Sequence, residues 1–267
     1  MLKQSLKIQD FERELKSFSR VVVCLSGGVD SCVLLALCVK NLGSENVKAF
    51  VGTSRYMIAS EIDCAKQLCS SLGVEAEFCD VGLAEITNAN PQNRCYLCKK
   101  NIFSLACAYA KSKDISFVLD GTNFDDLQQN RLGNIAKDEL GIKSPFATAQ
   151  IDKAQIREIA EQLGLQAISK KNSATCLMTR FQVGASVNES LLTSIEIAEQ
   201  YLKNLGFSLV RVRHYGSYVQ VQVASECVEK LLEKNVWDSV VAEFRKIGFL
   251  DVKVAKEGYK FGCMQKE

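Results

Sequence analysis

The chain has 267 residues, and its 33 lysines and arginines nearly balance its 31 aspartates and glutamates, leaving a net charge of +2. This balance argues against a general nucleic-acid binder, which needs a broad basic field. The sequence has no apolar run of about 20 residues, as a membrane-spanning helix would need, and Met1–Gln4 does not open a signal peptide. We expect a soluble cytoplasmic enzyme with one α/β domain and a smaller second domain.

The first two thirds of the chain alternate between helical and extended patterns. The predicted helices cover 2–18, about 30–42, 57–72 and 95–111, and the predicted strands cover 21–25, 47–51, 74–79 and 115–119. Strands that alternate with helices of this length indicate a doubly wound parallel sheet, hence an α/β fold. Ligands of such sheets bind beyond the carboxyl ends of the strands, so the loops that follow the strands are the candidate binding segments.

The first strand leads directly into Ser26-Gly27-Gly28-Val29-Asp30-Ser31, at the start of a helix. Backbone N–H groups at a helix N-terminus bind anions, and Gly27 and Gly28 let a phosphate approach the backbone. Ser26 and Ser31 add hydroxyl donors. Because Asp30 would repel a phosphate unless a divalent cation lay between them, the motif predicts a complex of a nucleotide with Mg²⁺. It is not a Walker motif, because no Gly-Lys-Ser/Thr follows.

This loop resembles the pyrophosphate (PP) loop, Ser-Gly-Gly-x-Asp-Ser, of the ATP pyrophosphatases. Those enzymes cleave ATP to AMP and pyrophosphate while activating a substrate as its adenylate. The resemblance implies an adenine nucleotide alpha hydrolase-like fold, a catalytic role for Asp30, and a nucleotide contact for Ser54 at the end of the second strand. The alternative is an ordinary strand-to-helix turn that happens to carry two glycines.

A second polar loop, Asp120-Gly121-Thr122-Asn123, follows the fourth predicted strand. Because the carboxyl ends of parallel strands share one edge of the sheet, this loop is expected beside the phosphate loop. Asp120, Thr122 and Asn123 are therefore candidate nucleotide-binding residues. The alternative is a turn that caps the next helix, with Asp125 or Asp126 as a charge at its N-terminus.

Two of the twelve cysteines, Cys95 and Cys98, lie three residues apart at a helix start and are able to chelate one metal. A structural zinc site would need two more ligands, and the single histidine, His214, does not supply a Cys/His pair. Cys176 is the remaining candidate, because it lies in a polar segment between helices. Three thiolates with an open fourth position favour an iron–sulfur cluster over zinc. The alternative is that Cys95 and Cys98 simply pack beneath the helix.

The pattern changes after Gly184. Helices are expected over 190–205, 227–233 and 237–247, and strands over 207–213, 218–223 and 249–254. These short elements predict a small α+β domain. We therefore expect an ATP pyrophosphatase domain over 1–184 and a substrate and oligomerisation domain over 185–267.

Over nearly its whole length the chain resembles the LarE family. These are ATP-dependent sulfur transferases that convert pyridinium carboxylates to thiocarboxylates in nickel-pincer nucleotide synthesis. The segments that carry the resemblance are the phosphate loop, Arg94-Cys95-Tyr96-Leu97-Cys98-Lys99, Asp120-Gly121-Thr122-Asn123, Lys143-Ser144-Pro145, Cys176-Leu177 with Arg180, Leu205-Gly206-Phe207, Arg211-Val212-Arg213 and Gly258-Tyr259.

The resemblance implies that ATP activates a substrate carboxylate as an acyl-adenylate and that Cys176 delivers sulfur. Some members of the family sacrifice the sulfur of this cysteine, whereas others hold a [4Fe-4S] cluster on three cysteines. Cys95, Cys98 and Cys176 place this chain in the second group. The resemblance also implies a small nucleotide-like carboxylate as substrate and a homo-oligomeric enzyme. From the apolar runs and the charge balance we expect no membrane partner and no nucleic-acid partner.

Three arginines, Arg180, Arg211 and Arg213, are suited to bidentate binding of a substrate phosphate or carboxylate. The alternative for Arg211 and Arg213 is a solvated strand face, because they alternate as exposed strand residues do. Gln220, Gln222 and Lys260 replace the charged residues Arg, Glu and Arg that this family has at these positions, and Asn172 replaces a proline, so the sulfur acceptor stays open.

Two further functions remain open on the sequence. A tRNA thiolase is able to combine the same loop with three cluster cysteines, but the balanced charge argues against it. The second open function is that of a non-enzymatic relative that binds ATP or a cluster. The replacements at Gln220, Gln222 and Lys260 in the substrate domain would permit it.

Overall fold

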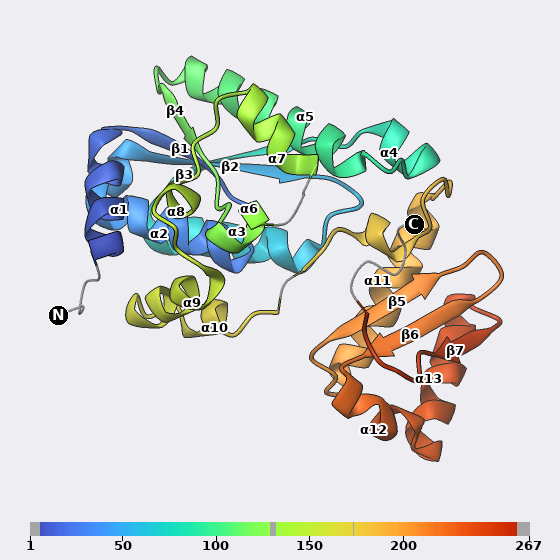
Figure 1. Cartoon of the computed structure of the whole chain (residues 1–267). Coiled ribbons are helices and arrows are strands. Elements are labelled where there is room, and N and C mark those ends of the chain that lie inside the picture. The colour runs from blue at the N-terminus through green and yellow to red at the C-terminus, as the bar shows by residue number, and fades with distance from the viewer. Residues whose placement is uncertain (1–5, 129–131, 173, 261–267) are drawn as a thin grey trace. The chain divides into compact units, whose positions relative to one another are not determined.

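The computed structural model describes residues 6–128, 132–172 and 174–260, and they form two compact units (Figure 1). The first unit comprises residues up to 54, 59–82 and 93–174, and the second comprises 55–58, 83–92 and the chain from 175 on. Residues 175–184 therefore pack with the second unit, although the sequence suggests a boundary at 184. The division into domains at 184 stays a prediction.

The first unit contains a four-stranded parallel sheet in the order β3-β2-β1-β4. Its strands are β1 (Val21–Cys24), β2 (Val47–Thr53), β3 (Glu75–Asp80) and β4 (Phe117–Leu119). Its helices are α1 (Leu6–Ser17), α2 (Val29–Leu42), α3 (Ala59–Leu72), α5 (Arg94–Ser112), α6 (Phe124–Gln128), α7 (Leu132–Glu139), α8 (Pro145–Thr148), α9 (Lys153–Gln162) and α10 (Gln166–Ser169), with a 3₁₀ turn at Ser44–Asn46. The predicted α/β fold is confirmed.

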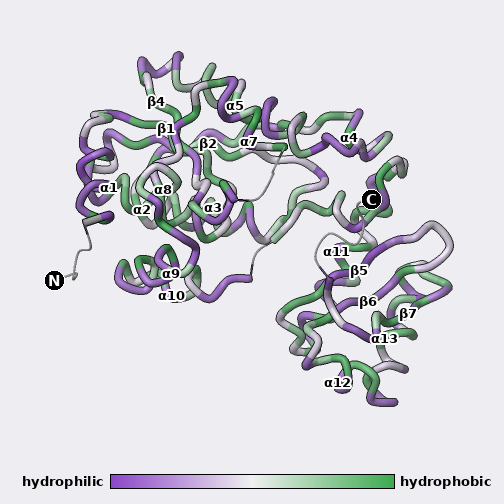
Figure 2. The backbone as a smooth tube through the Cα atoms, viewed as in Figure 1, coloured by the Kyte–Doolittle hydropathy of each residue, from purple (hydrophilic) through white to green (hydrophobic). Residues whose placement is uncertain are grey.

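The core of this unit lies around β1 and α2. All four residues of β1 are buried, because β2 and β4 flank the strand and helices cover both faces of the sheet. In Figure 1, α5 lies on one face and α1 and α2 lie on the other. Helix α2 packs against α1, α9, β1 and β2, so nearly all of its residues from Val29 to Cys38 are buried. Most of this helix is accordingly coloured as hydrophobic in Figure 2.

The second unit contains a three-stranded sheet in the order β5-β6-β7, in which β5 and β6 are antiparallel and β6 and β7 parallel. Its strands are β5 (Val210–His214), β6 (Val219–Val223) and β7 (Val252–Val254). Its helices are α4 (Ala84–Ala89), α11 (Glu189–Asn204), α12 (Val228–Leu232) and α13 (Lys234–Ile247), with 3₁₀ turns at Leu177–Arg180 and Ser225–Cys227. The predicted α+β character of the C-terminal segment matches this arrangement.

The observed elements differ from the predicted ones mainly at their ends and between residues 120 and 170. The N-terminal helix begins at Leu6, and residues 2–5 of the predicted helix lie outside the described residues. Helices α4, α6–α8 and α10 have four to eight residues, too few for a reliable periodic pattern. Helix α9 has ten residues and buries Ile156, Ile159 and Ala160 on one face, and it was missing from the predicted elements. No helix within the described ranges has the length and apolarity that crossing a membrane requires.

The turn between β1 and α2 depends on a glycine. Gly27 has a φ of +77°, and an added Cβ would lie 2.0 Å from the backbone oxygen of Glu61. Gly164 has the same φ, but nothing lies within 4 Å of its added Cβ. We predict that Gly164→Ala lowers the free energy of unfolding by ~1 kcal/mol, through the positive φ alone. Gly27→Ala should cost ~2 kcal/mol more, because the neighbouring backbone must shift.

The measurement is the denaturation of both variants by urea. Equal losses in the two variants would contradict the close packing of the loop against α3.

Candidate active site

The loop between β1 and α2 is held in shape by its two serines. The Ser31 hydroxyl accepts the Ser26 amide at 3.1 Å, contacts the Ser26 hydroxyl at 3.0 Å and donates to the Gly28 carbonyl at 3.2 Å. Gly28 occupies the N-cap of α2 and has no side chain to cap the amides of the first turn. The N-terminus of this 14-residue helix is thus preorganised to receive an anion.

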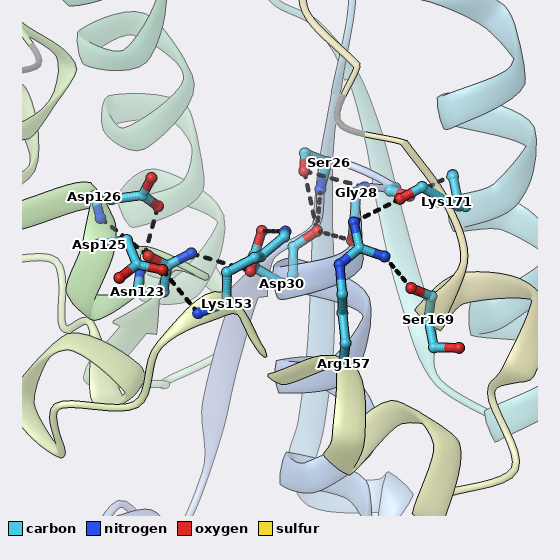
Figure 3. A network of polar contacts seen from close by, with 12 residues as sticks. Ser26, Gly28, Asp30, Asn123, Asp125, Asp126, Lys153, Arg157, Ser169 and Lys171 are labelled. Atoms are coloured by element: carbon cyan, nitrogen blue, oxygen red, sulfur yellow. Dashed lines mark hydrogen bonds and ion pairs between the residues drawn. The ribbon is translucent and has the colours of Figure 1, made fainter. Parts of the chain in front are cut away.

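Asp30 lies at the centre of a polar network that joins this loop to the second predicted loop (Figure 3). Its carboxylate accepts the side-chain amide of Asn123 at 3.2 Å and the ammonium of Lys153 at 2.5 Å. The backbone N–H of Lys153 in turn donates to Asp125 at 3.0 Å. The structure therefore brings Asp30 and Asn123 together at one edge of the sheet and adds a cation that the sequence analysis did not select.

Hydrogen bonds to the Asp120 side chain hold the second loop in shape. Its buried carboxylate accepts the Thr122 amide and hydroxyl at 3.2 and 2.6 Å and the Ser144 hydroxyl at 2.5 Å. A Cβ added to Gly121 would lie 2.7 Å from the Ser31 amide nitrogen, so this loop packs directly on the first turn of α2. Asp126 closes the same loop through hydrogen bonds with Asn123.

A second cation, Lys171, contacts the phosphate loop and also pairs with a residue of α3. Its ammonium donates to the Gly27 carbonyl at 2.8 Å and pairs with Glu61 at 2.9 Å. Arg157 holds this segment by donating to the carbonyls of Ser169 and Lys171. Figure 3 shows that these residues reach the loop from α9 and the segment after α10. Sequence reasoning missed Lys153, Lys171 and Arg157 because isolated cations in this region form no motif.

Ser54 stands at the end of β2, as the sequence analysis places it. Its hydroxyl oxygen is buried and has no hydrogen-bond partner among the described residues. A buried hydroxyl without a partner is costly, so its position is one where a ligand would relieve that cost.

Two of the three predicted cluster ligands share one helical turn. Cys95 is exposed and Cys98 is half-buried, and both lie in the first turn of α5 in the first unit. Cys176 lies in the second unit and is half-buried at the N-cap of the 3₁₀ turn. Over the described ranges, no three His, Cys, Asp or Glu side chains gather as a metal site would need. The donor set itself, soft thiolates with two of them one turn apart, is of the kind that iron–sulfur clusters use.

The backbone next to Cys176 is fixed by Arg180, whose side chain is fully buried. Its guanidinium forms a two-fold pair with Glu199, with both N–O distances 2.8 Å. The remaining nitrogen donates to the carbonyls of Thr175 and Cys176 and to the hydroxyls of Thr175 and Thr179, at 2.7–3.1 Å. Glu199 also accepts the amide of Val212 on β5 at 2.9 Å. Arg180 thus ties the Cys176 segment to α11 and β5.

Arg211 and Arg213 lie on the same face of β5 and are both buried. Arg213 donates to Gln222 at 2.8 Å and to the Thr179 carbonyl at 2.8 Å. Both guanidinium groups stack near the Tyr259 ring, at 5.5 and 5.9 Å from its centroid. The predicted alternative of a solvated strand face does not fit their burial.

The charge around these arginines is positive. Burial, and then the charge of Arg180, lower the pKa of Arg211 below its ordinary value, while Glu199 acts in the opposite direction more weakly. Among the described residues, Glu199 is the carboxylate that pairs with this group of arginines, through Arg180. Such a site favours an anion, because a carboxylate or phosphate would restore neutrality and accept bidentate hydrogen bonds.

Comparison with known proteins identifies the family to which the chain belongs. The NAD synthase family model matches residues 6–205. The pyridinium-3,5-bisthiocarboxylic acid mononucleotide synthase of Lactiplantibacillus plantarum is 30% identical over 252 residues, which cover 94% of this chain and 90% of that protein. The chain belongs to the LarE family of PP-loop ATP pyrophosphatases. The predicted family is confirmed, and with it the prediction of an ATP-dependent sulfur transferase.

Two other relatives differ in how much of the chain they match. An uncharacterised protein of Synechocystis sp. is 31% identical over 97% of each chain, so the LarE-type length and domain content are shared beyond one enzyme. A tRNA-specific 2-thiouridylase of Fusobacterium nucleatum is 30% identical over 61% of this chain and 52% of its own length. The similarity to the Lactiplantibacillus plantarum enzyme thus covers 94% of this chain, whereas the similarity to the tRNA enzyme covers 61% of it.

We predict that Glu199→Gln lowers the free energy of unfolding by ~3 kcal/mol or more, because it leaves the buried Arg180 charge without its partner. A matched control is Glu189→Gln at the start of the same helix. Glu189 pairs with Arg55 on the surface, so its loss should cost less than ~1 kcal/mol.

Thermal and chemical denaturation of both variants would measure the difference. Similar, small losses in the two would show that the buried pair does not hold the Cys176 segment.

Proposed function

We propose that the chain adenylylates a carboxylate of a pyridinium-type mononucleotide and replaces its oxygen by sulfur, giving a thiocarboxylate. The observation that carries this proposal is the buried, positively charged group of Arg180, Arg211 and Arg213 next to the Cys176 segment. An acidic mononucleotide offers both a phosphate and carboxylates to such a group. The relative from Lactiplantibacillus plantarum, whose name describes a bisthiocarboxylic acid mononucleotide, supports the same substrate class.

The phosphate loop would carry out the first half of the reaction. A free carboxylate is a poor electrophile, because attack would have to expel oxide. Its oxygen attacks the α-phosphorus of ATP, pyrophosphate leaves, and the acyl carbon gains AMP as a leaving group. The amides at the start of α2 would receive the phosphates, and Asp30 would hold the Mg²⁺ that neutralises their charge. Ser26, Gly27, Gly28, Ser31, Ser54, Asp120, Thr122 and Asn123 are proposed to shape this nucleotide site.

Lys153 and Lys171 extend the proposed nucleotide site. Both ammonium groups contact the loop in the structure, at Asp30 and at the Gly27 carbonyl. Ammonium groups held beside the phosphate loop would stabilise departing pyrophosphate electrostatically. Lys153 is bound to Asp30, the residue that would hold Mg²⁺, so its ammonium lies where it would add positive charge beside the phosphates.

Sulfur delivery is proposed to depend on Cys95, Cys98 and Cys176, which would hold a [4Fe-4S] cluster. When bound, such a cluster with one open iron supplies a sulfide nucleophile. Sulfur bonds to the acyl carbon, the bond to the AMP oxygen breaks, and AMP leaves with the electron pair. The alternative from the same residues is that Cys176 gives up its own sulfur. The exposure of Cys95 and the half-buried state of the other two thiols are compatible with either route.

The three arginines are proposed to have different roles. Arg211 and Arg213 would contact the substrate anion, because they lie on one face of β5 beside Tyr259. Arg180 contributes positive charge, but its donors are occupied by Glu199 and the Cys176 segment, so we propose that it positions that segment. Gln222 binds Arg213 as a neutral partner and leaves its charge to attract an acidic acceptor.

A tRNA thiolase is the second candidate function, supported by the partial match to a tRNA 2-thiouridylase. It would bind tRNA with a steep dependence on salt, which a net charge of +2 disfavours. We propose instead a homo-oligomeric enzyme of the cytoplasm, where ATP and reduced thiols are both available.

The central prediction concerns the acceptor. Purified protein should release pyrophosphate from ATP when pyridinium-3,5-biscarboxylic acid mononucleotide is present, and the acceptor should gain the mass difference between sulfur and oxygen. Arg213→Gln should lower kcat/KM for the acceptor roughly 10- to 100-fold, because a charged hydrogen bond is lost, while the Kd for ATP stays unchanged. Arg245→Gln, an exposed arginine of α13, is the control.

Stimulation of pyrophosphate release by tRNA but not by the mononucleotide would favour the thiolase. ATP binding without pyrophosphate release with either acceptor would contradict both functions.

The cluster is tested separately by iron and acid-labile sulfide in protein purified without oxygen. We expect about four irons per chain, lost in Cys176→Ala and in Cys95→Ala but kept in Cys227→Ala, which removes another half-buried thiol of the second unit. Iron-free protein after reconstitution, or iron retained in Cys176→Ala, would contradict a three-cysteine cluster and favour sulfur donation by Cys176 itself.

A further inference from the structure

Arg94 is the first residue of α5, and its side chain is buried without a partner in the described part of the chain. It is 7% exposed, and its buried Nε atom has no hydrogen-bond acceptor there. Nor does a carboxylate of the described residues form an ion pair with it. Burying an arginine in this state is costly, because its charge leaves water and gains no protein partner. An anion bound beside it would compensate for this cost.

Three other arginines of the described residues are buried, and each of them has a partner. Arg180, Arg211 and Arg213 all donate a hydrogen bond of 2.7–2.8 Å within the chain. Arg180 also forms an ion pair with Glu199 at 2.8 Å. Arg94 differs from all three, so packing alone does not account for a buried arginine at this position.

The two lysines that follow in the same segment of α5 also have partners. Lys100 pairs with Glu139 at 3.0 Å. Lys99 lies 3.9 Å from the buried carboxylate of Asp120. Among the described cations of this segment, Arg94 is therefore the one whose charge is not matched by a carboxylate.

Arg94 shares the start of α5 with two thiols. Arg94 and Cys98 are four residues apart and hence lie on one face of the helix. Because Cα–Cβ bonds tilt toward the N-terminus of a helix, the Cys98 side chain leans toward Arg94. Cys95 belongs to the same turn, and the N-cap residue Asn93 provides no side-chain hydrogen bond to the first amides of this 19-residue helix. A positive charge and the positive end of a helix dipole thus accompany both thiols.

The anion that fits these neighbours is the proposed iron–sulfur cluster. Three thiolates outweigh the charge of the usual [4Fe-4S] dication, so the cluster with its ligands is an anion. Hydrogen bonds to its sulfurs and nearby charges hold such a cluster and set its reduction potential. A phosphate or carboxylate would also pair with a guanidinium, but it would gain nothing from two thiols in the same turn.

We propose that Arg94 donates hydrogen bonds to the sulfur atoms of this cluster and compensates its negative charge. Cys95 and Cys98 supply two of the iron ligands, and Arg94 holds the cluster without being a ligand itself. This inference rests on the proposed function, because it presupposes the three-cysteine cluster. It concerns only residues of the first unit and does not depend on the identity of the sulfur acceptor.

The first test uses the full chain with its cluster, purified without oxygen. Arg94→Met should lower the midpoint potential by about 59 mV, a tenfold change for one electron, because a positive charge favours the reduced, more negative form. Iron release to a chelator should become roughly tenfold faster. Arg94→Lys, which keeps the charge, should recover most of the potential. Lys111→Met, which removes an exposed cation at the other end of α5, is the control and should change neither quantity.

The outcomes separate this inference from the proposed function. A loaded Arg94→Met protein with the potential and iron release of the parent would overturn the role of Arg94. A raised KM for the acceptor at unchanged potential would assign Arg94 to the substrate instead. Iron-free parent protein after reconstitution would contradict the cluster itself, and with it this inference.

The second test compares the unfolding of the full chain in urea after iron has been removed. Arg94→Met removes a buried charge without a partner, so its urea midpoint should equal or exceed that of the parent. The matched control is Arg180→Met, which removes a buried arginine that is paired with Glu199 and should lower the midpoint. A loss in Arg94→Met as large as that in Arg180→Met would show that Arg94 serves the fold, and would overturn the proposal.

Discussion

The close approach of two backbone segments to the first turn of α2 is the constraint on which the proposed nucleotide site depends. The backbone of Glu61 lies against Gly27 on one side, and Gly121 lies against the Ser31 amide on the other. Neither approach leaves room for a Cβ, so these glycines fix the relative positions of β1, α3 and the loop after β4. Lys153 and Lys171 then add positive charge to a loop whose own side chain, Asp30, is negative.

In the second unit the corresponding constraint is electrostatic. Burying three guanidinium groups is costly, and the pair between Arg180 and Glu199 compensates for one of them. Arg213 donates to neutral acceptors, Gln222 and the Thr179 carbonyl, which do not neutralise its charge.

How much the sequence predicts depends on whether the signal is local. The strand–loop–helix around Ser26–Ser31 was predictable, because β-branched residues, two glycines and an apolar helix follow one another. The position of the Asp120–Asn123 loop beside the phosphate loop followed from the rule that parallel strands end at one edge, whereas the contact between Asp30 and Asn123 was not predicted. Lys153 and Lys171 were not predictable, since their roles arise from tertiary contacts with residues more than a hundred positions away. Likewise, the burial of Arg211 and Arg213 reflects packing by Tyr259, which strand alternation alone does not reveal.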